Sequence, residues 1–150
     1  MTTLLYIDDE PLVADASAKF LRHSGFEVDV ALSGSEALEK LQSGRYDADI
    51  SDYHMPGMTG IELLKIIRSD IGDIPFILFT GKGREEVVIE AIEHGVDYYV
   101  QKGGTSGPLF ADLTHKINIA IQRRESERLL RINEKRLRKA QEIGKIGCWE

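Results

Sequence analysis

The chain has 150 residues, of which 42% are hydrophobic and 29% are charged, proportions that are ordinary for one soluble globular domain. Its net charge of −6 argues against a general nucleic-acid binder. The charge is uneven, because residues 1–111 hold 9 Lys or Arg against 19 Asp or Glu, whereas residues 112–150 hold 10 against 6. We interpret the basic C-terminal part as a solvated helix face and expect no direct binding of nucleic acid.

The sequence also indicates a compartment. Cys148 is the only cysteine, so an intrachain disulfide is excluded and a reducing environment is expected. The N-terminal residues lead into an apolar run without the basic segment of a signal peptide. No apolar stretch approaches the roughly 20 residues that a membrane-spanning helix requires. We therefore expect a cytoplasmic protein that does not associate with membranes.

Short apolar runs alternate with helical patterns along the first hundred residues. The apolar runs predict five strands, at residues 3–7, 26–30, 47–51, 75–79 and 97–101. Apolar residues at three- and four-residue spacing predict helices at residues 11–23, 35–43, 59–69 and 84–94. In the first helix this spacing places on one stripe Leu12, Ala16, Phe20 and His23. The alternation predicts an α/β fold in which helices cover both faces of a doubly wound parallel sheet.

The pattern changes near residue 107, where a fifth helix is predicted to start. An apolar stripe indicates that this helix first packs on the sheet, through Leu109, Leu113, Ile117, Ala120 and Ile121. Residues 122–128 are polar, so the helix is expected to leave the globule there. Three- and four-residue spacing then recurs at Leu130, Asn133, Leu137 and Ala140. A short coiled coil and a solvated connector helix both fit this segment, which Gly144 and Gly147 are expected to end.

Carboxylates stand at the ends of two predicted strands. Asp8 and Asp9 follow the first strand and Asp52 follows the third. Open parallel sheets bind ligands beyond the carboxyl ends of their strands, where the strand order reverses, and the flavodoxin-like order 2-1-3-4-5 reverses between strands one and three. Thr80 and Lys102 end strands four and five at the same edge. Because clustered carboxylates repel one another and are costly to desolvate, the cluster predicts a bound cation.

These residue types suit phosphoryl transfer. Mg²⁺ prefers one or two carboxylates together with waters and phosphate oxygens, and Asp8 and Asp9 fit that role. Asp52 is then free to act as a nucleophile toward phosphorus, which would form an acyl phosphate. The ammonium of Lys102 would neutralise charge, and the hydroxyl of Thr80 would donate to a phosphoryl oxygen.

Over roughly residues 3–121 the chain resembles the CheY-like receiver domains of two-component response regulators. The resemblance is carried, in order, by Asp8-Asp9, residues 52–60 (Asp-Tyr-His-Met-Pro-Gly-Met-Thr-Gly), Thr80 and residues 97–102 (Asp-Tyr-Tyr-Val-Gln-Lys). It implies that Asp52 takes a phosphoryl group from the phosphohistidine of a histidine kinase or phosphotransfer protein. Mg²⁺, or Mn²⁺, would be required.

The resemblance also assigns roles to the other site residues. Asp9, Asp52 and the backbone carbonyl of His54 would ligate the metal, and Asp8 would act directly or through water. Thr80 and Lys102 would bind the phosphoryl group. Thr80 and Tyr99 correspond to the switch pair that remodels the face of the fourth helix, fifth strand and fifth helix. A homodimer would form through that face or through the C-terminal helix.

Three departures from the family pattern bear on the site. Gly103 stands where the family usually has Pro, which puts the family's cis bond after Lys102 in doubt. Gly81 stands where a small residue such as Ala is usual. His54 and Lys82 occupy the variable positions two beyond Asp52 and Thr80, which tune the lifetime of the phosphoryl group in this family.

The last residues predict further organisation. Residues 143–150 resemble the opening of a PAS sensor domain. We therefore predict a receiver domain at 1–121, a linker helix at 122–143 and the start of a PAS domain at 144–150, within a longer sensory protein or hybrid kinase. The chain is expected to act as a phosphoacceptor with self-catalysed transfer and dephosphorylation. The alternatives are a pseudo-receiver that only binds partners and, less favoured, a metal-dependent aspartyl-phosphate phosphatase.

Overall fold

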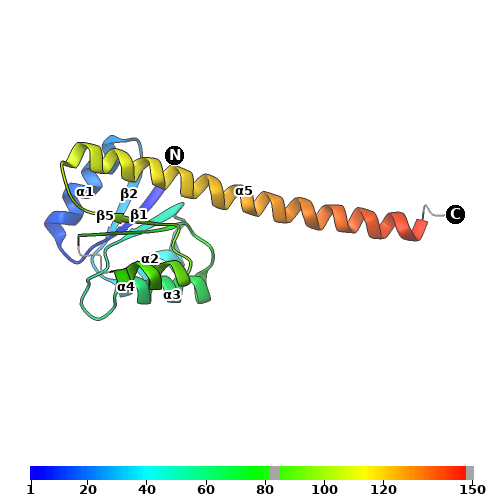
Figure 1. Ribbon diagram of the computed structural model, residues 1–150, viewed down its shortest axis with the longest axis horizontal. Helices are drawn as coiled ribbons and strands as arrows, with labels where there is room; N and C mark the ends of the chain where they lie inside the picture. Colours follow the sequence, from blue (N-terminus) through cyan, green and yellow to red (C-terminus); the bar gives the residue numbers. More distant parts are fainter. Residues whose placement is uncertain (82–84, 148–150) are drawn as a thin grey trace.

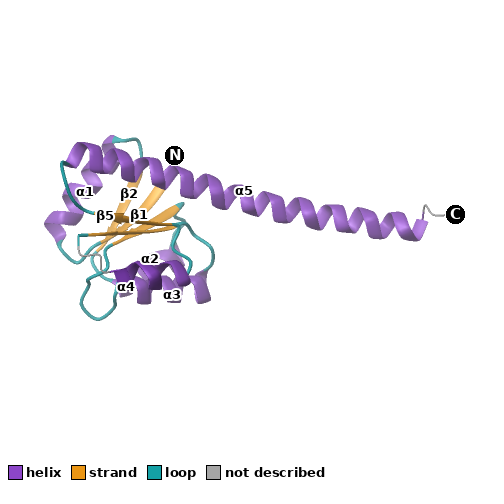
Figure 2. Cartoon of the chain, in the orientation of Figure 1, coloured by secondary structure: helices purple, strands orange, loops and turns teal. Residues whose placement is uncertain are grey.

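The fold is a five-stranded parallel sheet between two layers of helices (Figures 1 and 2). The computed structural model describes residues 1–81 and 85–147, and the side chains of residues 1–81 and 85–141. The strands are β1 (Thr3–Ile7), β2 (Glu27–Ala31), β3 (Ala48–Ser51), β4 (Phe76–Thr80) and β5 (Tyr98–Gln101). They lie in the order β2-β1-β3-β4-β5, all parallel, which confirms the predicted flavodoxin-like order and its reversal between β1 and β3.

The helices follow the predicted positions closely. They are α1 (Pro11–His23), α2 (Gly34–Ser43), α3 (Gly60–Ile66), α4 (Glu85–Glu93) and α5 (Ser106–Gly147). A π-helical segment, Ile67–Ile71, continues α3. Two helices begin at the side-chain caps that sequence patterns favour: Ser33 accepts from the Glu36 amide and Thr59 from the Glu62 amide.

Each face of the sheet has its own apolar core. Figure 1 shows α1 and α5 on one face and α2, α3 and α4 on the other. Because side chains alternate along a strand, Leu4 and Tyr6 of β1 pack toward α1 and α5, whereas Leu5 and Ile7 pack toward α2 and α3. β4 is buried along its whole length, as expected for a central strand covered on both faces.

The predicted stripe of α1 is wrong. Leu12 is 85% exposed, Phe20 is 42% exposed, and both Ala16 and His23 lie in solvent. The face that packs on the sheet instead consists of small residues and one leucine: Ala14, Ser17, Ala18 and Leu21. Small side chains allow α1 to approach the sheet closely, so hydrophobicity alone selected the wrong face of this helix.

α5 begins on the sheet and continues far beyond it. Leu113, Ile117 and Ala120 are completely buried, as the predicted stripe requires. The helix then remains unbroken through Gly147 and projects from the globule as a single rod (Figures 1 and 2). The predicted end of the helix at Gly144 is therefore wrong, because the helix continues through Gly147. Among the described helices, none combines the length and the apolar character that crossing a membrane demands.

Candidate functional site

Three carboxylates meet at the carboxyl ends of β1 and β3. One oxygen from each of Asp8, Asp9 and Asp52 lies within 4.8 Å of the other two. The strand pairing brings them together, because Ile7 pairs with Ser51 and the Asp52 amide donates to the Ile7 carbonyl at 2.9 Å. Asp8 is 1% exposed, whereas Asp9 and Asp52 are partly open to solvent. A cluster of hard oxygen donors at this spacing fits a divalent cation such as Mg²⁺.

Lys102 brings positive charge to the same cluster. Its Nζ lies 3.1 Å from Asp8 Oδ2 and 4.0 Å from Asp52 Oδ2. The residue is held by the end of the sheet, since its amide donates to the Thr80 carbonyl at 2.9 Å. The described residues contain no cis peptide bond, so the Lys102–Gly103 peptide is trans. Lys102 thus reaches the carboxylates without the cis bond that the family pattern would supply.

The local backbone fixes the direction of Asp52. The Tyr53 amide donates to Asp52 Oδ1 at 2.8 Å, and the Ser51 hydroxyl donates to the Asp52 carbonyl at 2.8 Å. Gly60, the first residue of α3, packs so tightly that an added Cβ would collide with the Asp52 carbonyl and reach Leu78 Cδ1 at 2.9 Å. The start of α3 is therefore pressed against the backbone of the candidate nucleophile.

Thr80 and Tyr99 lie on the same face of two neighbouring strands. Leu78 pairs with Tyr99 and Thr80 pairs with Gln101, and alternation puts Thr80 and Tyr99 on the side of α3 and α4. Thr80 is 2% exposed. The Tyr99 hydroxyl has no hydrogen-bond partner among the described residues, and burial raises the pKa of this phenol. Tyr98 faces the opposite side, where Arg123 donates to its hydroxyl at 2.9 Å.

The remaining sequence-predicted residues lie at the rim. His54 is exposed, and its ring stands edge-on to Tyr53 with centroids 4.9 Å apart. Gly81 and Gly103 have open space or ordinary contacts around a Cβ built on them. Lys82, the variable position after Thr80, lies outside the described residues.

Asp49 is a titratable residue that the sequence interpretation passed over. It lies within β3, is fully buried, and neither of its carboxylate oxygens has a hydrogen-bond partner among the described residues. Burial raises the pKa of Asp49 to about 8, against a smaller opposing effect from Arg68. A lone Asp within an apolar strand of a doubly covered sheet is the signal that could have revealed it.

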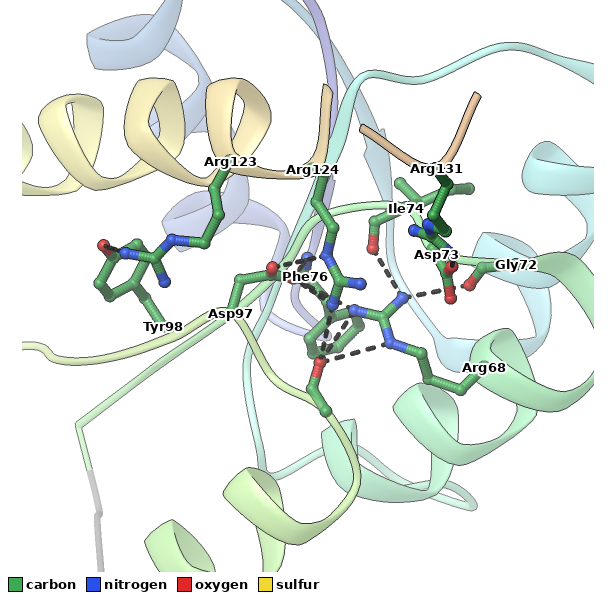
Figure 3. Close-up of polar contacts among 11 residues, drawn as sticks. Arg68, Gly72, Asp73, Ile74, Phe76, Asp97, Tyr98, Arg123, Arg124 and Arg131 are labelled. Carbon is green, nitrogen blue, oxygen red and sulfur yellow. Dashed lines mark hydrogen bonds and ion pairs between the residues drawn. The ribbon is translucent and has the colours of Figure 1, made fainter. Parts of the chain in front are cut away.

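A second polar cluster occupies the opposite end of the sheet (Figure 3). Asp97 receives the guanidinium of Arg68 at 3.1 Å, that of Arg124 at 2.8 Å and the Phe76 amide at 2.7 Å. Its side chain is only 4% exposed. Arg68 also donates to the carbonyls of Gly72, Ile74 and Gly95. We call Arg68, Asp97 and Arg124 the arginine hub; it joins the π-helical segment after α3, the residue before β5, and α5.

Comparison with known proteins decides the family. The family model for the response regulator receiver domain matches residues 4–114. The chain belongs to this family. It is 36% identical over 106 residues to the chemotaxis protein CheY of Pseudomonas aeruginosa, covering 69% of this chain and 86% of that protein. Receiver domains of response regulators accept phosphoryl groups in two-component systems, and they are signalling modules.

Two further relatives place the receiver in context. The chain is 32% identical over 124 residues to the DNA-binding response regulator MtrA of Mycolicibacterium smegmatis, covering 83% of this chain but only 52% of MtrA, about half its length. The structure of the response regulator TrrA from Thermotoga maritima, in complex with Mg²⁺-BeF, is 33% identical with a TM-score of 0.69. That match covers 77% of this receiver chain and 99% of the TrrA chain.

Proposed function

We propose that Asp52 is the phosphoacceptor of this receiver and takes its phosphoryl group from the phosphohistidine of a histidine kinase or phosphotransfer protein. The observation that carries the proposal is the meeting of three carboxylates within 4.8 Å beside the ammonium of Lys102. Of the three, Asp8 is buried and paired to Lys102, whereas the side chain of Asp52 is 17% exposed and stands where a donor can reach it. An exposed carboxylate oxygen can attack phosphorus in line.

The donor set fits a divalent cation. Asp8, Asp9 and Asp52, with the backbone carbonyl of His54, would hold Mg²⁺ or Mn²⁺, and the cation would neutralise charge on the phosphoryl oxygens. TrrA, which shares this fold, was crystallised with Mg²⁺-BeF. Lys102 would neutralise the opposite side of the transferring group. Because Lys102 lies 3.1 Å from Asp8, it also compensates the one buried carboxylate of the cluster.

Thr80 and Tyr99 would change conformation when Asp52 is phosphorylated. Both residues lie on the α3 and α4 side of neighbouring strands, and the Tyr99 hydroxyl is free of hydrogen-bond partners within the described part of the chain. A phosphoryl group on Asp52 offers new acceptor oxygens to the Thr80 hydroxyl, and Tyr99 would then turn toward the space that Thr80 leaves. The surface of α4, β5 and α5 changes as a result.

The domain division is part of the same proposal. Residues 1–121 form the receiver, residues 122–143 a linker helix, and residues 144–150 the start of a PAS domain in a longer sensory protein or hybrid kinase. The burial of α5 supports the first boundary, because Ala120 is fully buried and Ile121 still packs on the core. Residues 148–150, where the PAS resemblance is strongest, lie outside the described residues.

The two alternative functions have less support. A pseudo-receiver needs no metal cluster, yet Asp8, Asp9 and Asp52 converge here. A dedicated phosphatase of the aspartyl-phosphate type needs a second acid two residues after its nucleophile, and that position holds His54. Self-catalysed phosphoryl transfer and dephosphorylation at Asp52 is therefore the chemistry that we assign.

The test is labelling by acetyl phosphate in the presence of Mg²⁺. We expect one labile acyl phosphate per chain, lost on removal of Mg²⁺ and lost in Asp52→Asn. Asp15→Asn, which changes an exposed acid on α1, is the matched control and should label normally. Absence of labelling in the wild-type chain would support the pseudo-receiver, and continued turnover of unrelated phosphoesters would support the phosphatase.

A further inference from the structure

The projecting part of α5 exposes apolar side chains that the receiver does not cover. Leu130 and Leu137 are each 60% exposed, and Leu129 is 51% exposed. Packing of an apolar face supplies most helix stability in proteins, and the projecting part of α5 receives none of it from the receiver. The length of unbroken helix beyond the globule therefore calls for a partner along its side.

The exposed residues lie on the side of α5 that points away from the receiver. A groove of about 620 Å³ lies between α5 and the segments that precede β3 and β4. The side chains with which α5 lines this groove include Arg124, Arg128, Arg131 and Lys135. Ser126, Leu130, Asn133 and Leu137 each stand two residues from one of these positions, which is about 200° around the helix. A partner on that side would not meet the globule.

These outward residues form a regular seam. Ser126, Leu130, Asn133, Leu137 and Ala140 alternate four- and three-residue steps, which is the heptad spacing of a coiled coil. We call these five residues the α5 seam. Arg123, one step before it, donates to the Tyr98 hydroxyl at 2.9 Å, so the preceding position is already engaged by the receiver.

Charge selects the orientation of the partner. In an antiparallel pair that matches Leu130 with Ala140, Glu134 would face its own copy and Arg136 would face its own copy, and like charges at such positions are unfavourable. In a parallel pair each seam residue meets its own copy. The flanking contacts then join Glu134 to Leu129 and Arg136 to Gln141, without like charges. Asn133 would then face Asn133 of the second copy across the seam.

We propose that α5 of one copy pairs in parallel with α5 of a second copy through the α5 seam. The pair is isologous and two-fold symmetric, with the two receivers on its outer sides. Arg124 of the arginine hub binds Asp97 (Figure 3) and so holds each helix against its own receiver. This contact would keep the seam turned outward. This interface uses no residue of the carboxylate cluster. The proposal therefore specifies how two copies of the chain pair and does not depend on phosphorylation of Asp52.

Single-cysteine cross-linking of the full chain tests both the seam and its direction. In chains that also carry Cys148→Ser, Leu130→Cys and Leu137→Cys should each form a homodimer disulfide under mild oxidation, since parallel pairing brings like positions together. Lys139→Cys, on the other side of the helix, is the matched control and should react at least about tenfold more slowly. Cross-linking that appears only when Leu130→Cys and Ala140→Cys chains are mixed would instead establish antiparallel pairing and overturn the proposal.

Light scattering over a dilution series provides the second measurement. The wild-type chain and Asp52→Asn should both show a mass that rises toward twice 16.8 kDa with concentration. Leu137→Asp should remain monomeric, whereas Lys139→Asp should still dimerise. A wild-type chain that stays monomeric at every concentration, or a dimer that survives Leu137→Asp, would overturn the interface. Either result would leave the labelling of Asp52 unaffected, so the two proposals fail separately.

Discussion

At the scale of single residues, the site depends on how its charges are balanced. Asp8 is buried, and its close cationic partner is Lys102, whose Nζ also approaches Asp52. A bound divalent cation and this ammonium would share the same carboxylates. The lysine therefore both compensates the acids before a metal arrives and competes electrostatically with that metal.

Replacing Lys102 with Met should separate these two effects. We expect Mg²⁺ to bind several times more tightly, because a positive charge 3.1 Å from Asp8 has been removed. Labelling of Asp52 by acetyl phosphate should slow by about 10- to 100-fold, because transition-state charge loses a stabilising group. Titration calorimetry measures the first quantity and phosphate incorporation the second. Lys116→Met, on the surface of α5, should change neither, and an unchanged Mg²⁺ affinity in Lys102→Met would contradict this view.

Asp49 makes the stability of the fold depend on pH. Its pKa is raised to about 8 in the folded chain and is near 3.9 when unfolded, so only the folded state keeps the proton between these values. The unfolded state releases that proton as pH rises, and the stability gained below pH 4 is lost progressively up to about pH 8. Above about pH 8 the folded state also releases it, and the loss stops.

Asp49→Asn should remove this dependence. The amide is neutral at every pH, so the variant should exceed the wild type in free energy of unfolding by up to about 4 kcal/mol at pH 7, and by little at pH 4. Urea unfolding at several pH values measures the difference. Asp15→Asn, which changes an exposed acid, is the control and should follow the wild-type curve. A gap that does not widen between pH 4 and pH 7 would show that Asp49 is charged in the folded chain.

At the scale of elements, the junction of β3 and α3 is closely packed around Gly60. Gly60→Ala should lower the free energy of unfolding by about 1–3 kcal/mol, since the new Cβ meets the Asp52 carbonyl, which cannot move without shifting β3. The same shift should misplace Asp52 and slow its labelling. Chemical denaturation and acetyl phosphate labelling check the two effects. Gly103→Ala has open space around its Cβ and should leave stability nearly unchanged.

Elements with a strong local signal were predictable from the sequence. The five strands fall within one residue of their predicted limits, because each is a short apolar run bounded by turn residues. The topology followed from their alternation with helices. The packed face of α1 was not predictable in this way: Ala14 and Ala18 are buried for their small size, while Leu12 stays in solvent. Periodicity measures hydrophobicity and is insensitive to how closely two elements approach.

The long-range polar contacts of the arginine hub could not be predicted from the sequence, for a different reason. The carboxylate cluster was predictable because all its members stand at strand ends, which the topology brings to one edge. Arg68, Asp97 and Arg124 have no such common position: one lies in a π-helical segment, one before β5 and one midway along α5. Nothing in their spacing distinguishes them from solvated charges, and only the folded arrangement joins them.

At the scale of the whole molecule, the arginine hub ties the linker helix to the receiver. A chain that ends at Ile121 loses Arg124, whereas a chain that ends at Arg128 keeps it. Both should fold and bind Mg²⁺, because the buried part of α5 ends near Ile121. The shorter chain should be less stable by about 1–3 kcal/mol, since Asp97 loses one of its two arginine partners and keeps Arg68 and the Phe76 amide.

Thermal and urea unfolding of the two shortened chains provide this comparison. In the full chain, Arg131→Ala removes an exposed ion pair with Asp73 and should cost less than about 1 kcal/mol. Equal stability of the two shortened chains would mean that the hub does not hold α5 to the receiver. Failure of the shorter chain to fold would contradict a receiver boundary at residue 121.

The continuity of α5 gives it the properties of a rigid shaft. Residues 122–147 make up about 39 Å of helix, so a tilt of about 5° at the arginine hub displaces the far end by about 3 Å. Each residue added to the shaft also turns that end by about 100°. Inserting seven residues would lengthen the shaft by about 10 Å and leave its phase nearly unchanged, whereas inserting two would turn the end to the opposite side. The length of α5 therefore sets how far its end moves when the helix tilts at the receiver. It also sets the direction in which that end faces.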